Sequence, residues 1–121
     1  MVDMHLRNIL LVVNNMERSK KFYCGFFGLQ VINDFEENVI LTEGLVLQEK
    51  KSWEQLIETD TVTGNASELF FVEDNLDVFL HKIENYMTES SQTMNVRENC
   101  WGRRVVMLKD PDGHLIEVAE R

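Results

Sequence analysis

A glutamate stands inside the apolar run that ends the chain. In the stretch "HLIEV", Glu117 lies between Ile116 and Val118. Side chains alternate between the two faces of a strand, so this carboxylate lies on the other face of the strand from its two apolar neighbours. A carboxylate can move a proton as a general base, or it can donate oxygen to a bound cation. We therefore ask which elements hold it and what lies beside it.

The two halves of the chain repeat one order of elements. A shift of 60 residues places "NILLVVNNME" on "ELFFVEDNLD", and a shift of 69 places "EGLVLQE" on "DGHLIEV". Each half reads as a strand, a helix and three further strands. A duplication of this kind constrains the fold strongly. It predicts an α+β fold of two βαβββ modules that form a curled mixed sheet, a half-barrel with a cleft, and carry helices on the outer face.

The repeat also sets the expected organisation of the chain. We expect a single domain over residues 1–121, with module one at about 6–50, a connector at 51–67 and module two at 68–121. No second domain or low-complexity tract is visible.

Capping residues mark the ends of the expected helices. Asn15 is placed to begin the first helix and Gly28 to end it, and Asp74 or Asn75 is placed to begin the helix of the second module. The amphipathic spacing of apolar residues in both segments supports these assignments.

The connector is expected to carry a short helix. The stretch "SWEQ" fits a capping box, with Ser52 as N-cap and Gln55 at the third helical position. Trp53 would lie on this helix. The helix either covers a cleft or packs as a simple connector, and both readings stay open.

Glu117 has counterparts at duplicated positions. It matches Gln48 of the first half, and Glu68 matches Asn8. All four are polar residues in otherwise apolar strands, so in a two-module sheet they could converge on the concave face as a metal or ligand site. A lone strand glutamate is more often solvated or paired with a cation, and Arg104 is then its expected partner on the same face.

The turn "DPDG" predicts how the last two strands pair. Pro111 and Gly113 favour a tight turn. With Lys109 and His114 flanking it, Glu117 would lie opposite Val106. One face would then carry Arg104, Val106, Leu108, Leu115 and Glu117. The other face, which is expected to pack against the helices, would carry Val105, Met107, Ile116 and Val118.

Two segments carry a family resemblance. The stretch "LLVVNNMERSKKFYCGFFGLQV" looks like the opening strand and helix of the glyoxalase / bleomycin-resistance / dioxygenase group, the vicinal-oxygen-chelate superfamily. The stretch "DPDGHLIEV" resembles its closing hairpin. The resemblance implies paired βαβββ modules around a cleft, usually in a dimer. It also implies that metal-dependent members carry ligands on the first and last strand of each module, at positions that match Asn8, Gln48, Glu68 and Glu117.

The sequence departs from this metal-binding pattern. Glu is the usual residue at position 117, but Asn8 and Glu68 stand where the resemblance leads us to expect His. Oxygen ligands suit Mg, Ca and Mn, while imidazole suits Zn, Ni and Fe. We therefore expect no cofactor, or a weakly bound divalent metal held by Glu68, Glu117 and Gln48.

Two functions follow from the resemblance. The first is a binding protein that holds a small organic molecule in the cleft between modules without a transition metal. Its candidate ligand-binding residues are Asn8, Gln48, Trp53, Phe70, Trp101 and Arg104. The alternative is a divalent-metal-dependent lyase or isomerase of the glyoxalase type. It would act on a substrate with vicinal oxygens and use Glu117 and Glu68 as its catalytic groups.

Composition limits the classes of partner that the protein is expected to bind. The 121 residues carry a formal net charge of −9, which argues against binding nucleic acid or an anionic membrane. Two cysteines form neither a disulfide framework nor a metal pair, so a reduced cytoplasm is expected. Open sheet edges and apolar surface on two modules favour a homodimer.

The repeat suggests a test of convergence. If the four polar residues meet, Asn8→His would place an imidazole beside Glu68, Gln48 and Glu117 and raise the affinity for Zn, Ni or Mn. Calorimetry would measure the gain. A variant that binds metal no better than the wild type would mean that the residues do not meet, and that Glu117 pairs with Arg104.

Overall fold

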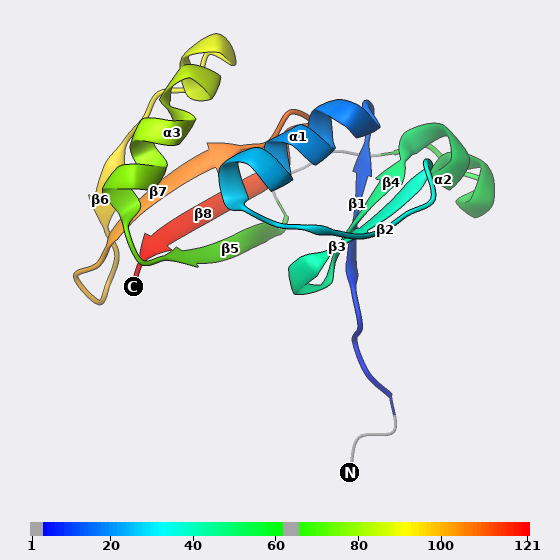
Figure 1. Cartoon of the computed structure of the whole chain (residues 1–121), viewed down its shortest axis with the longest axis horizontal. Helices are drawn as coiled ribbons and strands as arrows, with labels where there is room; N and C mark the ends of the chain where they lie inside the picture. Colours follow the sequence, from blue (N-terminus) through cyan, green and yellow to red (C-terminus); the bar gives the residue numbers. More distant parts are fainter. Residues whose placement is uncertain (1–3, 62–65) are drawn as a thin grey trace. The chain divides into compact units, whose positions relative to one another are not determined.

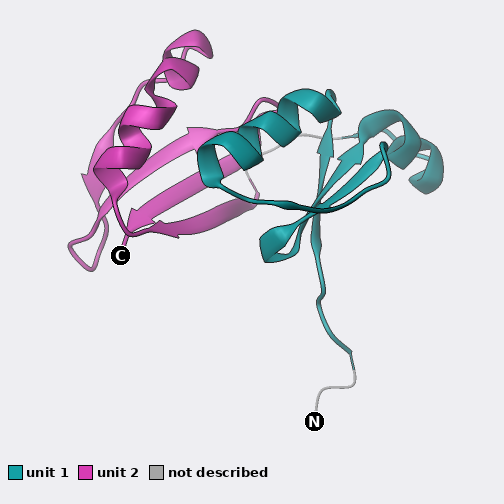
Figure 2. Cartoon of the chain, in the orientation of Figure 1, with its two compact units in different colours: residues 1–62 teal, residues 63–121 magenta. Residues whose placement is uncertain are grey.

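The computed structural model describes residues 4–61 and 66–121. The chain forms two compact units, residues 1–62 (unit 1) and 63–121 (unit 2), and each is described by itself (Figure 2). Together the units contain α-helices and mixed sheets, which confirms the expected α+β class. None of the helices in the described residues has the length and apolar character needed to cross a bilayer.

The elements follow the order that the repeat predicts (Figure 1). Those of unit 1 are β1 (Ile9–Val13), α1 (Met16–Phe27), β2 (Val31–Asp34), β3 (Asn38–Leu41), the short 3-10 helix η1 (Thr42–Gly44), β4 (Leu45–Glu49) and α2 (Lys50–Ile57). Those of unit 2 are β5 (Glu68–Glu73), α3 (Leu76–Glu89), β6 (Val96–Glu98), β7 (Arg104–Lys109) and β8 (Leu115–Glu120).

Both sheets have the same topology. The strand order is β1-β4-β3-β2 in unit 1 and β5-β8-β7-β6 in unit 2. In each unit the first and last strands pair in parallel, and the other neighbours pair antiparallel. The duplication is therefore real at the level of the fold. It gives two separate four-stranded sheets that are not closed into a barrel.

The caps of α1 and α3 confirm the sequence prediction. Asn15 Oδ1 accepts a hydrogen bond from Arg18 N at 3.0 Å, and Gly28 ends α1 in the left-handed region. Asn75, rather than Asp74, caps α3 by accepting from Val78 N. The shift of 60 residues thus holds for the first strand and the helix of both units.

The prediction of a capping box in the connector is wrong. Helix α2 begins at Lys50 with Glu49 as N-cap, so Ser52 lies inside the helix. The Ser52 hydroxyl donates to Glu49 O at 3.2 Å and accepts from Gln48 Nε2 at 3.0 Å. These bonds tie the first turn of α2 to the end of β4, so the helix follows that strand without a loop.

One face of each sheet is covered by a helix. In unit 2 the helix face is built from alternate residues of β7 and β8, and α3 lies against β8. Its buried side chains are Val106, Leu108, Ile116 and Val118, and those of α3 are Leu76, Phe79, Ile83 and Met87. The prediction for Ile116 and Val118 is confirmed. Glu117 therefore lies on the opposite face, as expected.

The predicted pairing of β7 with β8 is wrong by one residue. Glu117 lies opposite Met107, and Val106 lies opposite Val118. Val106 is therefore on the helix face, as are Arg104 and Leu108, while Val105 and Met107 share the face of Glu117. A shift of one residue inverts a whole strand, which accounts for all five misplacements.

The buried Asp110 causes this difference. Its Oδ1 accepts hydrogen bonds from Asp112 N and His114 N, both at 2.9 Å. Asp110 N donates to His114 O at 3.0 Å, so the loop closes between these two residues. The pair of Asp110 and His114 encloses three residues, one fewer than a turn flanked by Lys109 and His114, so Lys109 pairs with Leu115 instead.

The packing of α3 can be tested by a cavity. Ile83→Ala removes a fully buried side chain from the core of unit 2 and should lower the free energy of unfolding by about 2–5 kcal/mol. Val78→Ala on the exposed side of the same helix is the control, and should change it by no more than about 0.5 kcal/mol. Urea denaturation followed by circular dichroism measures both. Equal losses would mean that α3 does not pack through this face.

Candidate functional site

The face of the unit 2 sheet opposite α3 carries the candidate site, and we call it the open face. Strand pairing arranges its residues in rows across the sheet. The first row is Lys109, Leu115 and Glu68. The second is Met107, Glu117 and Phe70. The third is Arg97, Val105, Ala119 and Val72. Glu68 and Glu117 lie in adjacent rows on the paired strands β5 and β8, and are diagonal neighbours.

The two carboxylates interact. Burial raises the pKa of Glu117 above its ordinary value of 4.5, and the negative charge of Glu68 and a hydrogen bond between the two carboxyl groups raise it further. A hydrogen bond between two carboxyl groups requires a proton on one of them, since an ionised carboxylate only accepts. Glu117 can therefore hold a proton more readily than an ordinary carboxyl group, or accept a hydrogen bond from a cationic or hydroxyl group of a ligand.

Apolar side chains flank Glu117 on both sides. Phe70 is its partner on β5 and is 54% exposed, and Met107 is its partner on β7 and is 42% exposed. A carboxylate pair beside an accessible aromatic ring and a thioether is a suitable surface for an organic ligand with an apolar body. The sequence predicted Phe70 in this role. It missed Met107, because the register error placed that residue on the helix face.

Unit 1 has no equivalent carboxylate pair. The side chain of Gln48 accepts from Asn38 Nδ2 at 2.8 Å and donates to Ser52 Oγ at 3.0 Å. An amide that both accepts and donates in this way joins β3, β4 and α2. Gln48 is thus held in a structural network, in contrast to the carboxylates of unit 2.

Asn8 is not a neighbour of Gln48. Gln48 lies opposite Val12, four residues further along β1 than Asn8, which is a separation of about 13 Å. The backbone of Arg7 lies near Gly44 instead, because a Cβ at Gly44 would come within 3.2 Å of Arg7 O. Asn8 is exposed and precedes the first paired residue. A histidine at position 8 would therefore not lie beside Gln48.

The repeat contains an offset that causes this separation. Glu117 lies opposite Phe70, which the shift of 60 residues matches to Leu10, yet Gln48 lies opposite Val12. Strands β1 and β4 are displaced by two residues relative to β5 and β8. The sequence shifts describe each strand correctly, but the pairing between first and last strands differs between the units.

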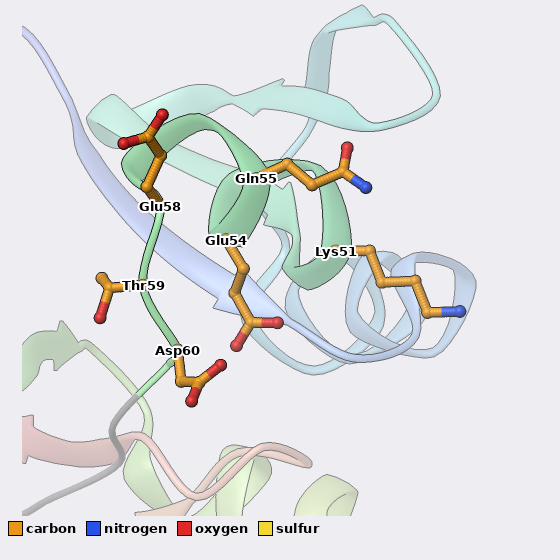
Figure 3. A pocket seen from close by; sticks show the side chains of 6 residues that line it. All are labelled: Lys51, Glu54, Gln55, Glu58, Thr59 and Asp60. Carbon is orange, nitrogen blue, oxygen red and sulfur yellow. The ribbon is translucent and has the colours of Figure 1, made fainter.

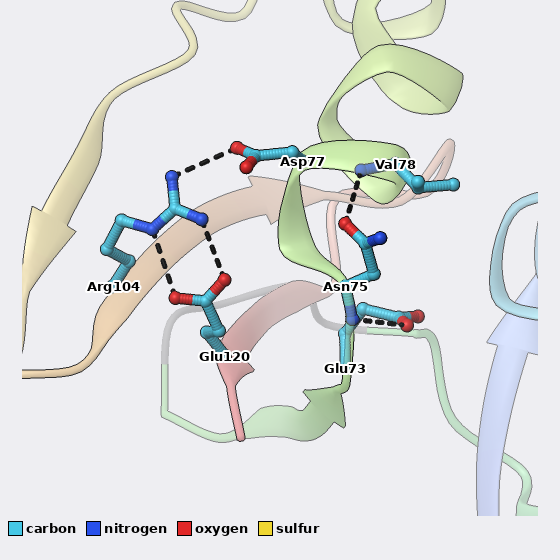
Figure 4. Close-up of polar contacts among 6 residues, drawn as sticks. All are labelled: Glu73, Asn75, Asp77, Val78, Arg104 and Glu120. Atoms are coloured by element: carbon cyan, nitrogen blue, oxygen red, sulfur yellow. Dashed lines mark hydrogen bonds and ion pairs between the residues drawn. The ribbon is translucent and has the colours of Figure 1, made fainter.

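Arg104 does not pair with Glu117. Its guanidinium donates to both oxygens of Glu120, from Nε at 3.1 Å and from Nη2 at 2.7 Å, and to Asp77 Oδ1 at 3.0 Å (Figure 4). These bonds raise the pKa of Arg104 and lower the pKa of both acids. Because Arg104 is on the helix face, it joins β7, β8 and the first turn of α3.

The two tryptophans lie in different surroundings. Trp53 is half-buried on α2 in unit 1. Trp101 is 79% exposed in the hairpin between β6 and β7 of unit 2. Of the two, Trp101 is therefore the more accessible to a ligand or partner.

An open hollow of about 360 Å³ lies beside α2 (Figure 3). All the residues that line it come from α2 and the segment that follows, namely Lys51, Glu54, Gln55, Glu58, Thr59 and Asp60. Glu54 accepts a hydrogen bond from Thr61 N at 2.6 Å, which lowers the pKa of this carboxyl. The lining contains no aromatic or aliphatic side chain, so it does not resemble a site for an organic ligand.

The residues present do not fit a transition-metal site. Across residues 4–61 and 66–121, no three His, Cys, Asp or Glu side chains come together as metal ligands. Glu68 and Glu117 supply two oxygen donors without an imidazole, and the amide of Gln48 is engaged with Asn38 and Ser52. A stable transition-metal centre normally has at least three protein ligands.

Comparison with known families agrees with this architecture. The model of the glyoxalase-like domain family matches residues 6–121. The chain belongs to this family. The expected superfamily is thereby confirmed. A comparison with curated proteins finds no match.

Solved structures of the family share the fold. A protein of unknown function from Agrobacterium tumefaciens str. C58 is 26% identical, with a TM-score of 0.82 over 100% of this chain and 97% of that one. A lactoylglutathione lyase from Agrobacterium tumefaciens is 19% identical, with a TM-score of 0.69 over 93% of this chain and 90% of that one. A glyoxalase/bleomycin resistance protein/dioxygenase family enzyme from Burkholderia phytofirmans PsJN is 17% identical, with a TM-score of 0.76 over 97% and 98%.

The carboxylate pair predicts a pH-dependent effect of Glu117→Gln. Because the folded-state pKa of Glu117 is raised, the folded state binds more protons than the unfolded state just above pH 4.5, and stability falls as pH rises through this window. The variant should be more stable than the wild type at pH 7, by up to about 1 kcal/mol. This advantage should disappear near pH 3, where Glu117 is protonated and no longer repels Glu68.

Chemical denaturation at the two pH values measures this difference. Glu84→Gln, at an exposed position of α3, is the matched control and should show no such change between the two conditions. A Glu117→Gln variant that is equally destabilised at pH 3 and pH 7 would contradict the interaction between Glu68 and Glu117.

Proposed function

We propose that this protein binds a small organic molecule on the open face of unit 2, without a transition metal. The observation that carries the proposal is the placement of Glu68 and Glu117 as diagonal neighbours on paired strands, on a face with accessible apolar side chains. Membership of the glyoxalase-like domain family supports a small-molecule role, although the family's fold alone does not specify the ligand.

The pair indicates what part of a ligand it would recognise. Two adjacent carboxyl groups repel one another when both are ionised, and a cation relieves that repulsion. A protonated primary amine has three N–H donors and a positive charge. Both carboxylates can accept hydrogen bonds from it at once. Phe70 and Met107 would contact the apolar part of the ligand. We therefore infer a ligand with an amine, or a strongly donating hydroxyl group, attached to an apolar body.

A divalent-metal-dependent lyase or isomerase of the glyoxalase type is the alternative. The position of Glu117, which matches a ligand position of metal-dependent relatives, favours it. The donor set does not, because the described residues supply only two carboxylates at this place. A binding function needs no third ligand, and we prefer it for that reason. We also propose that the protein forms a homodimer, which open edges such as β1 and β6 support.

Binding of hexylamine tests the proposal. The probe should bind the wild type at pH 7, and Glu117→Gln should weaken binding by about tenfold, which corresponds to about 1.4 kcal/mol of binding free energy. Binding should also weaken as pH falls toward 4.5, because the pKa of Glu117 is raised and its protonation removes a charge that attracts the amine. Isothermal titration calorimetry measures both effects.

Two controls make the result decisive. Glu84→Gln changes the net charge equally on α3 and should leave hexylamine binding unchanged. Elemental analysis of protein purified without chelators should find less than stoichiometric transition metal. Stoichiometric metal that is lost in Glu117→Gln would favour the lyase or isomerase, and equal hexylamine binding by the wild type and Glu117→Gln would refute the binding site.

A further inference from the structure

The open face also carries two arginines. Arg97 lies opposite Val105 and so shares the face of Met107 and Glu117. A hydrogen bond of 2.9 Å from Asn99 N to Arg103 O continues the ladder of β6 and β7 one step beyond the last paired residues. Because successive pairs alternate between faces, Arg103 also belongs to the open face. Both side chains are exposed.

The two arginines occupy neighbouring positions on the open face. Arg97 and Arg103 are diagonal across the strand pair, a position in which long side chains reach one another. Neither forms an ion pair or side-chain hydrogen bond within the described parts of the chain, residues 4–61 and 66–121. Arg104, the next residue, binds Glu120 and Asp77. Two cationic side chains without an acidic partner in the described residues thus occupy neighbouring positions in a chain with a net charge of −9.

The hairpin that presents these arginines is ordered by Asn99. Its Oδ1 accepts from Trp101 N at 3.0 Å and from Arg103 N at 3.1 Å, and its carbonyl accepts from Gly102 N at 3.0 Å. Gly102 has a φ of 74°, which a residue with a side chain would rarely adopt. The backbone around Arg103 is therefore organised before any ligand arrives, which lowers the entropy cost of binding.

We propose that Arg97 and Arg103 form an anion-binding subsite, and that the ligand of the open face carries charges of opposite sign at its two ends. This rests on the proposed function, in which Glu68 and Glu117 bind an amine or hydroxyl group. Arg97 is two strands and two residues away from Glu117, which places their backbone positions about 12 Å apart. A carboxylate or phosphate at one end of the ligand would accept from both guanidinium groups, as such groups do in bidentate pairs.

The space between the two charged pairs is apolar. Met107 on β7 lies between the strands of Arg97 and Glu117, and it is exposed. Among the described residues, neither arginine forms an ion pair with Glu68 or Glu117. A molecule with an apolar middle and charged ends would contact the carboxylates, Met107 and the guanidinium groups together. An ω-amino carboxylate has this chemistry.

The experiment compares probes that carry one or both charges. The probes are an alkylamine, an alkanoate and an ω-aminoalkanoate of equal chain length, tested over a series of lengths. Trp53→Phe leaves Trp101 as the one tryptophan in the sequence, so fluorescence reports on the hairpin of Arg103. Calorimetry gives the affinities. We expect the ω-aminoalkanoate to bind at least ten times more tightly than the alkylamine once its length spans the two pairs.

Matched variants assign the effect to the arginines. The double variant Arg97→Gln/Arg103→Gln should lose the tenfold advantage and keep alkylamine binding, while Arg97→Lys/Arg103→Lys should keep part of it. The double variant Lys21→Gln/Lys82→Gln removes the same charge at exposed positions of α1 and α3 and should keep the full advantage. Unfolding midpoints check that all variants fold.

The outcomes separate this inference from the proposed function. If the ω-aminoalkanoate binds no better than the alkylamine at any length, the anion subsite is refuted and the amine site stands. If alkylamine binding does not depend on Glu117, the proposed function fails, and the two-ended ligand fails with it. The alkanoate then tests the arginines alone, because binding that is lost in Arg97→Gln/Arg103→Gln shows an anion site by itself.

Discussion

The carboxylate of Asp110 sets the geometry of unit 2. By accepting hydrogen bonds from Asp112 N and His114 N, it fixes the length of the loop that joins β7 to β8. The length of that loop determines which residues of the two strands lie opposite one another. Arg104 consequently points to α3, where it binds Glu120 and Asp77, and Met107 lies beside Glu117 on the open face. A turn that differed in length by one residue would exchange these two faces of β7.

Patterns that depend on local sequence were predictable. The duplicated βαβββ order, the cap at Asn15, a cap at Asp74 or Asn75 and the face of Glu117 all follow from short-range periodicity and capping chemistry. Pairings between strands were harder, since they depend on side chains that enter loops. The Asp110 carboxylate accepts hydrogen bonds from Asp112 N and His114 N, and these bonds set a register of β7 that differs by one residue from the prediction. The residue types in "DPDG" do not reveal these bonds. The offset of β1 against β4 likewise separates Asn8 from Gln48.

The two units use their matching polar positions differently. Gln48 has both a donor and an acceptor, so it satisfies Asn38 and Ser52 at once and connects β4 to the helix that follows it. Glu117 has only acceptors when ionised, and its neighbour is a second carboxyl group. It therefore needs a proton or a cationic partner from outside the strand. The duplicated framework has produced a structural network in unit 1 and two adjacent carboxyl groups in unit 2.

Like-charged neighbours on one sheet face are unfavourable for folding. The open face nevertheless carries two such pairs of opposite sign, and each is on adjacent strands with its backbone held in place by ladder hydrogen bonds. The same chain shows that it can neutralise such charges, since Arg104 lies one residue from Arg103 and has two acidic partners. Local arrangements that lower the stability of the fold are expected at functional sites, where binding determines which residue types are present. No ion pair joins the two pairs of charges among the described residues, so a ligand with two charged ends can neutralise both.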